Sequence, residues 1–149
     1  MEVTMRRNRP TPFLFIKISA LFLAAVLSAG STFAGSAAIN CQPHEGPCTL
    51  PLGGETVTLE ITPRPVTAMR TSVFAVTVSG KQPTGAPYID LGMPAMKMGP
   101  NRVMLKPAGN GAYTGKGVIV RCKSGRRTWF ANVVVPGEGE ARFVFDVVY

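Results

Sequence analysis

The sequence predicts an all-β fold, an immunoglobulin-like antiparallel β-sandwich of about seven strands. Three observations lead to this prediction. From residue 57 onward, apolar and polar residues alternate in short runs, as they do in strands buried on one face. Turn signals built on glycine, proline and asparagine separate these runs. No helical periodicity follows the first 34 residues. A barrel or jelly roll is the alternative, for which the chain is short.

The first half of the sandwich is expected to hold four strands, over residues 57–61, 74–78, 88–91 and 103–105. The first strand ends at Pro63, since proline cannot donate to a sheet ladder. In the fourth, Val103 and Leu105 point inward while Met104 points outward. The sequence Asn110-Gly111 that follows is a strong hairpin signal.

The second half is expected to hold three strands, over residues 117–122, 129–135 and 143–149. In the first of these, the alternation places Val118, Val120 and Cys122 on one face. Ser124-Gly125 and Pro136-Gly137 provide the turns between the three strands. We expect one buried core between the two sheets, built on Leu59, Phe74, Trp129, Val133, Phe143 and Phe145.

Residues 1–34 have the pattern of a secretory signal peptide. A basic start that includes Arg6 and Arg7 precedes an apolar stretch over residues 13–29, and small residues follow. We expect cleavage between Ala34 and Gly35, which predicts a periplasmic protein. An uncleaved membrane anchor is the alternative, but the apolar run is short and contains a lysine, Lys17.

The exported part is divided by prediction into a cysteine-containing segment, residues 35–55, and the sandwich domain, residues 56–149. Cys41 and Cys48 can close a small loop by a disulfide, which leaves Cys122 unpaired. A bridge from either of them to Cys122 is the alternative, and the sequence does not choose. His44, the single histidine, lies between the first two cysteines and is a candidate metal ligand.

Composition weakens two function classes. The chain carries a formal charge of +8, but four of its positive residues fall in the predicted leader, and no basic stripe interleaved with aromatic residues remains. Nucleic acid is therefore not an expected partner. With one histidine, few carboxylates and no nucleophile motif, the sequence offers no catalytic constellation and identifies no small-molecule substrate. We therefore do not expect an enzyme.

The stretch over residues 90–105 holds four of the seven methionines. Met93, Met96 and Met98 lie within six residues, and Pro94 and Gly99 make a loop more favourable than a helix there. Methionine in such a place can fill an irregular gap in a core. Its thioether is also a soft ligand that suits Cu(I). These methionines are candidate copper ligands, with Cys122 as a further soft ligand.

Several motifs resemble the YtkA-like and FixH-type group of small exported or membrane-anchored immunoglobulin-like domains. The motif M-P-x-M matches at Met93 to Met96, G-x-Y at Gly111 to Tyr113, and F-x-F-D-V at 143–147, with Trp129 between the last two. The resemblance covers residues 57–149 and implies a role in periplasmic copper handling or respiratory oxidase assembly. Members with a histidine after the methionine motif differ from this chain, which has Met98 there.

Three functional hypotheses follow. The first is a periplasmic protein that binds or delivers Cu(I) through Met93, Met96 and Met98, with Cys122 or His44. The second is a non-catalytic module that docks on a membrane protein, a cuproprotein or a respiratory assembly partner through exposed methionines and Leu91. The third is a thiol redox protein that acts through Cys122.

Overall fold

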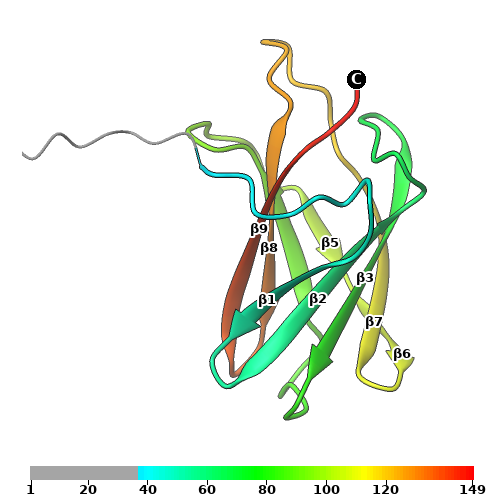
Figure 1. Cartoon of the computed structure of the whole chain (residues 1–149), viewed down its shortest axis with the longest axis vertical. Helices are drawn as coiled ribbons and strands as arrows, with labels where there is room; N and C mark the ends of the chain where they lie inside the picture. Colours follow the sequence, from blue (N-terminus) through cyan, green and yellow to red (C-terminus); the bar gives the residue numbers. More distant parts are fainter. Residues whose placement is uncertain (1–36) are drawn as a thin grey trace, which may run out of the picture. The chain divides into compact units, whose positions relative to one another are not determined.

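The computed structural model describes residues 37–149, which form nine strands and no helix. The strands are β1 (Cys48–Leu52), β2 (Glu55–Thr62), β3 (Thr71–Ser79), β4 (Tyr88–Gly92), β5 (Arg102–Met104), β6 (Lys106–Gly109), β7 (Ala112–Val118), β8 (Thr128–Val135) and β9 (Gly139–Asp146) (Figure 1). In this part of the chain we find no helix long and apolar enough to cross a membrane. The predicted leader, residues 1–34, lies outside the described residues.

The strands form two antiparallel sheets, which confirms the predicted sandwich. One sheet has the order β1-β2-β3-β7-β6 and the other β5-β4-β8-β9. Each inner face carries the apolar residues of an alternating strand, as in β8, where every second residue from Trp129 to Val135 is buried. All six residues expected in the core have no exposed surface: Leu59, Phe74, Trp129, Val133, Phe143 and Phe145.

Two strands were not predicted, and both lie at the edges of one sheet. β1 contains Pro51 and β6 contains Pro107, which interrupt the alternation and suit only an edge position. β1 pairs with β2 along its whole length, from Cys48 opposite Leu59 to Leu52 opposite Glu55. The sheet therefore begins at Cys48, within the cysteine-containing segment and before the predicted boundary at residue 56.

The predicted strand over residues 117–122 is also wrong. The strand in that region is β7, which ends at Val118, and the buried residue that follows it is Ile119 rather than Val120. Two glycines in β7 interrupt the alternation of apolar and polar residues, so the sequence pattern did not reveal this strand. A Cβ on Gly115 would lie 2.4 Å from the carbonyl oxygen of Met104, and one on Gly117 would lie 2.5 Å from Val103. These positions lack side chains because β5 passes directly against them.

Three loops gather at one end of the sandwich, which we call the loop end: residues 63–70, 93–101 and 119–127. The strand register places them together, because Gly92 pairs with Phe130 and Thr71 pairs with Val118. Figure 1 shows these loops and the C-terminal residue at its upper end. Met93, Met96, Met98 and Cys122 therefore all belong to loops at this end, whereas Met104 is the last residue of β5.

We expect Trp129→Ala to lower the free energy of unfolding by about 3–5 kcal/mol, since it removes a large, fully buried side chain from between the sheets. Urea denaturation followed by circular dichroism measures the change. Val148→Ala is the control, because Val148 is 41 % exposed and its truncation should cost less than about 0.5 kcal/mol. Equal stability of the two variants would contradict this description of the core.

Candidate functional site

The methionine loop, residues 93–101, connects β4 to β5 and is closed at its base by the backbone. The N–H of Leu91 donates to the carbonyl of Asn101 over 2.8 Å, and the N–H of Met96 donates to the carbonyl of Met93 over 3.3 Å. Ala95 has a left-handed backbone, with φ of 57°, which completes this tight turn. This stretch is therefore a loop rather than a helix, as its proline and glycine content predicts, and backbone hydrogen bonds close it.

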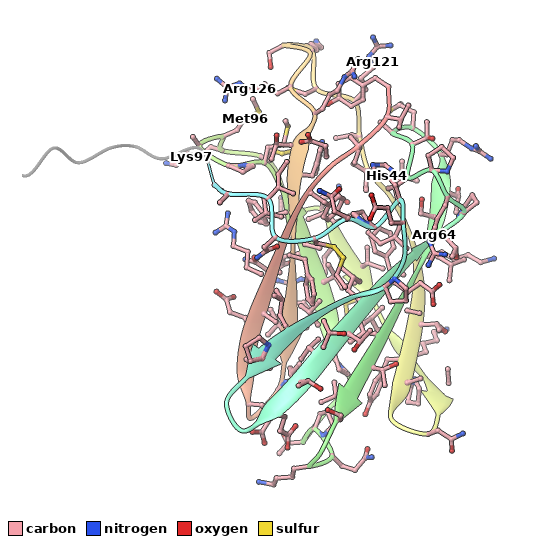
Figure 2. The ribbon with its side chains drawn as sticks, in the orientation of Figure 1. His44, Arg64, Met96, Lys97, Arg121 and Arg126 are labelled. Atoms are coloured by element: carbon pink, nitrogen blue, oxygen red, sulfur yellow. A yellow bond between two sulfur atoms is a disulfide. The ribbon has the colours of Figure 1, made fainter. Side chains whose placement is uncertain are left out.

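The three methionines of this loop differ in burial. Met93 is only 2 % exposed and belongs to the core. Met96 and Met98 are half-buried, pack against that core and line one open groove of about 480 Å³. Lys97, between them, is exposed, and Figure 2 shows Met96 and Lys97 on the same turn. The structure thus brings two thioethers into one groove, and Met93 is not among the residues that line it.

The rest of this groove offers no free carboxylate. Asp90 accepts two hydrogen bonds from Arg102, at 2.7 and 3.0 Å, and this contact raises the pKa of the Arg102 guanidinium. Phe130 forms part of the wall, lying over Gly92, where a Cβ would come within 2.4 Å of the ring. A hard cation would find its best oxygen ligands already paired, whereas a soft cation would meet the two thioethers.

Cys122 is a free, half-buried thiol in the loop between β7 and β8. Its Sγ lies 2.9 Å from the hydroxyl of Ser124. Hydrogen bonds from that hydroxyl and from the Ser124 backbone, with smaller contributions from the backbone and charge of Arg126, lower the pKa of the Cys122 thiol. This environment favours the thiolate, which is both the nucleophile and the soft metal ligand.

Met69 is the functional candidate that the sequence analysis missed. It lies 53 residues before Cys122, yet its Sδ accepts a hydrogen bond from the N–H of Arg121 over 3.3 Å. Met69 and Cys122 line one open groove of about 460 Å³, so a second pair of sulfur groups faces a common space. The local sequence carried no signal for this pair, because only the packing of the loop at 63–70 against the loop at 119–127 joins them.

His44 has both ring nitrogens engaged. Nδ1 accepts from the N–H of Val66 over 3.1 Å, and Nε2 lies 3.0 Å from the carbonyl of Asp146, to which it donates. The disulfide that closes around His44 is Cys41–Cys48, one of the pairings the sequence left open. The imidazole links the N-terminal segment to the sandwich, and a metal ion could bind it only by displacing one of these bonds.

Within residues 37–149, no group of three or more histidine, cysteine or acidic side chains is placed to hold a metal ion. Thioethers lie outside that ligand set, so this finding bears on Zn²⁺, Cu²⁺ and Ca²⁺ rather than on Cu(I). Comparison with protein-family models, curated proteins and solved structures found no match. The resemblance to YtkA-like and FixH-type domains therefore stays a prediction.

The lowered pKa of Cys122 predicts how the thiol reacts with iodoacetamide. We expect the rate of alkylation to reach its midpoint at a lower pH than it does for an ordinary cysteine thiol. Ser124→Ala should raise this midpoint, because it removes the hydrogen bond that contributes most to the shift. The same protein in urea, with Cys41 and Cys48 still oxidised, is the reference. A midpoint in the folded protein at or above that reference would contradict the assignment.

Proposed function

We propose that the protein is an exported copper-handling protein that binds Cu(I) through the sulfur groups of its loop end. The observation that carries the proposal is the half-burial of Met96 and Met98 along a single groove. A methionine that only filled the core would resemble Met93, and one that faced only solvent would resemble Met104, which is 62 % exposed. Met96 and Met98 are held in place yet remain accessible, as ligands for an incoming ion must be.

The choice of Cu(I) rests on the chemistry of the groups present. Thioethers are soft and uncharged and need no deprotonation, so they select Cu(I) over hard divalent cations. The pair formed by Met69 and Cys122 offers a second soft position, with a thiol whose ionisation is already favoured. Affinity at the thioether groove should therefore change little with pH, whereas affinity that depends on Cys122 should rise with pH until the thiol is ionised.

A module that docks on a partner protein is the second candidate function, but one observation changes the patch through which it would dock. Leu91, expected to form part of an exposed contact patch, is only 4 % exposed and belongs to the core. The patch that remains in the methionine loop consists of Met96 and Met98, the same side chains that line the groove. A membrane protein or a cuproprotein that receives the metal would be expected to contact the protein there. Thiol redox chemistry at Cys122 remains the third hypothesis.

We expect the double variant Met96→Leu/Met98→Leu to bind Cu(I) at least about tenfold more weakly than the unmodified protein, since leucine keeps the volume but removes the thioethers. Anaerobic competition with a chromogenic Cu(I) chelator measures the affinity. The matched control is Met104→Leu, which changes an exposed methionine outside both sulfur grooves. Unchanged affinity in the double variant would assign these methionines to packing or docking. Cys122→Ser, combined with the double variant, measures how much the pair formed by Met69 and Cys122 contributes to the affinity for Cu(I).

A further inference from the structure

A basic surface covers part of the loop end. It is formed by Arg70, at the end of the loop at 63–70, and by Arg121, Lys123, Arg126 and Arg127 in the loop at 119–127. All five side chains are exposed, and Figure 2 shows Arg121 and Arg126 extending outward from the tip. None of the five takes part in an ion pair within residues 37–149. Their charges are therefore not neutralised by an acidic partner in this part of the chain.

Exposed apolar side chains lie among these cationic residues. Met69 is 66 % exposed, Val148 41 % and Val120 39 %, three of the most exposed large apolar residues of the described chain. The backbone holds them together, because the N–H of Met69 donates to the carbonyl of Ile119 and the N–H of Ala68 to the carbonyl of Val148, each over 2.8 Å.

The conformation of Met69 adds a second cost to its exposure. Its φ of 62° is a left-handed backbone conformation that a residue with a long side chain rarely adopts. Hydrogen bonds to Ile119 and Arg121 hold Met69 in this conformation, but they leave its apolar side chain exposed to water. Contact with an apolar environment at this point would offset the cost of exposure.

Tyr149 fixes the shape of the basic surface. Its hydroxyl donates to the carbonyl of Arg126 and accepts from the N–H of Cys122. The guanidinium groups of Arg121 and Arg127 lie 5.4 and 5.9 Å from the centre of its ring, within the range of cation–π contacts. The loop that carries four of the cations is therefore ordered before any partner arrives.

Two acidic side chains on strands that run towards this end, Asp146 and Glu60, have partners of their own. Asp146 Oδ1 accepts a hydrogen bond from the hydroxyl of Thr128 over 2.7 Å. Glu60 pairs with Arg64 over 2.6 Å. The two loops that carry the cations, residues 63–70 and 119–127, contain no acidic residue, so the surface presents positive charge.

We propose that this basic surface binds an anionic lipid bilayer, with the cations on the lipid phosphates and the apolar side chains at the boundary of the acyl chains. Arginine suits phosphate because its planar donors can bind two oxygens at once. Binding at a membrane interface is driven by the burial of apolar groups and by attraction to anionic lipid. This surface offers both, because its exposed apolar side chains lie among cations. The surface lies on a protruding tip, which can reach a bilayer without a large contact area. A specific protein interface, in contrast, buries about 800 Å² on each partner.

The test uses the full chain with an environment-sensitive fluorophore on Cys122, the free thiol beside the surface. Because this reporter senses the loop end, contact of another part of the chain with lipid does not by itself change its emission. We expect a blue shift with vesicles of phosphatidylcholine and phosphatidylglycerol at 3:1, and none with phosphatidylcholine alone. Raising the salt concentration from about 0.05 to 0.5 M should abolish the shift, because screening weakens the attraction.

Two variants with the same change in net charge test whether vesicle binding depends on this surface or only on the net charge of the protein. Each basic residue near an anionic surface contributes about a fivefold factor in affinity, so Lys123→Glu/Arg126→Glu should weaken vesicle binding at least about 25-fold. The control is Lys106→Glu/Lys116→Glu, which reverses two exposed lysines on β6 and β7; its affinity should change less than about threefold.

Three results would overturn the proposal. One is an equal shift with neutral and anionic vesicles, and another is a shift in the unmodified protein that survives high salt. The third is a shift with poly-glutamate but not with anionic vesicles, which would assign the surface to an acidic protein. Since none of these three results needs a charge-reversed variant, the test holds even if such a protein does not fold. Copper affinity is measured separately, so its loss or retention leaves this test unaffected.

Discussion

The packing of the aromatic residues between the two sheets is the contact on which the rest of the structure depends. Trp129, Phe143 and Phe145 come from one sheet and Phe74 from the other, and all four are fully buried in a single cluster. Their burial fixes the ends of the strands relative to one another. The loops at the loop end can therefore be irregular in sequence and still hold definite positions, because the strands that carry them cannot shift.

This rigid core explains how the methionines of one loop can occupy different positions. Met93 extends the core beneath its loop, and this burial holds the following turn against the sandwich. Met96 and Met98 then lie at the rim, where a small change in the loop would bring a thioether out of the packing. A soft ion that binds there would compete with weak dispersion contacts rather than with a hydrogen bond, which favours an exchangeable site over a permanent one.

The sequence predicted the sandwich and its core because alternation with period two is a strong signal wherever one face is buried. It failed at β7, where glycines replace the apolar residues that would have shown the pattern. At the site, the methionine loop was recognisable because its residues are neighbours in sequence. The pairing of Met69 with Cys122 was not, because it depends on contact between two loops. His44 was a reasonable candidate ligand by residue type, and only its two hydrogen-bond partners show its structural role.

The position of Asn40 and His44 along β9 has a consequence for self-association. β9 is the outer strand of its sheet, and such strands offer unpaired backbone groups to other chains. Asn40 bonds to the carbonyl of Arg142 and to the N–H and carbonyl of Val144, and His44 bonds to the carbonyl of Asp146. Asn40 and His44 thus engage every second residue from Arg142 to Asp146 without adding a strand. The segment before β1 therefore blocks edge-to-edge association along this part of β9. Any ligand that displaced His44 would expose part of that edge.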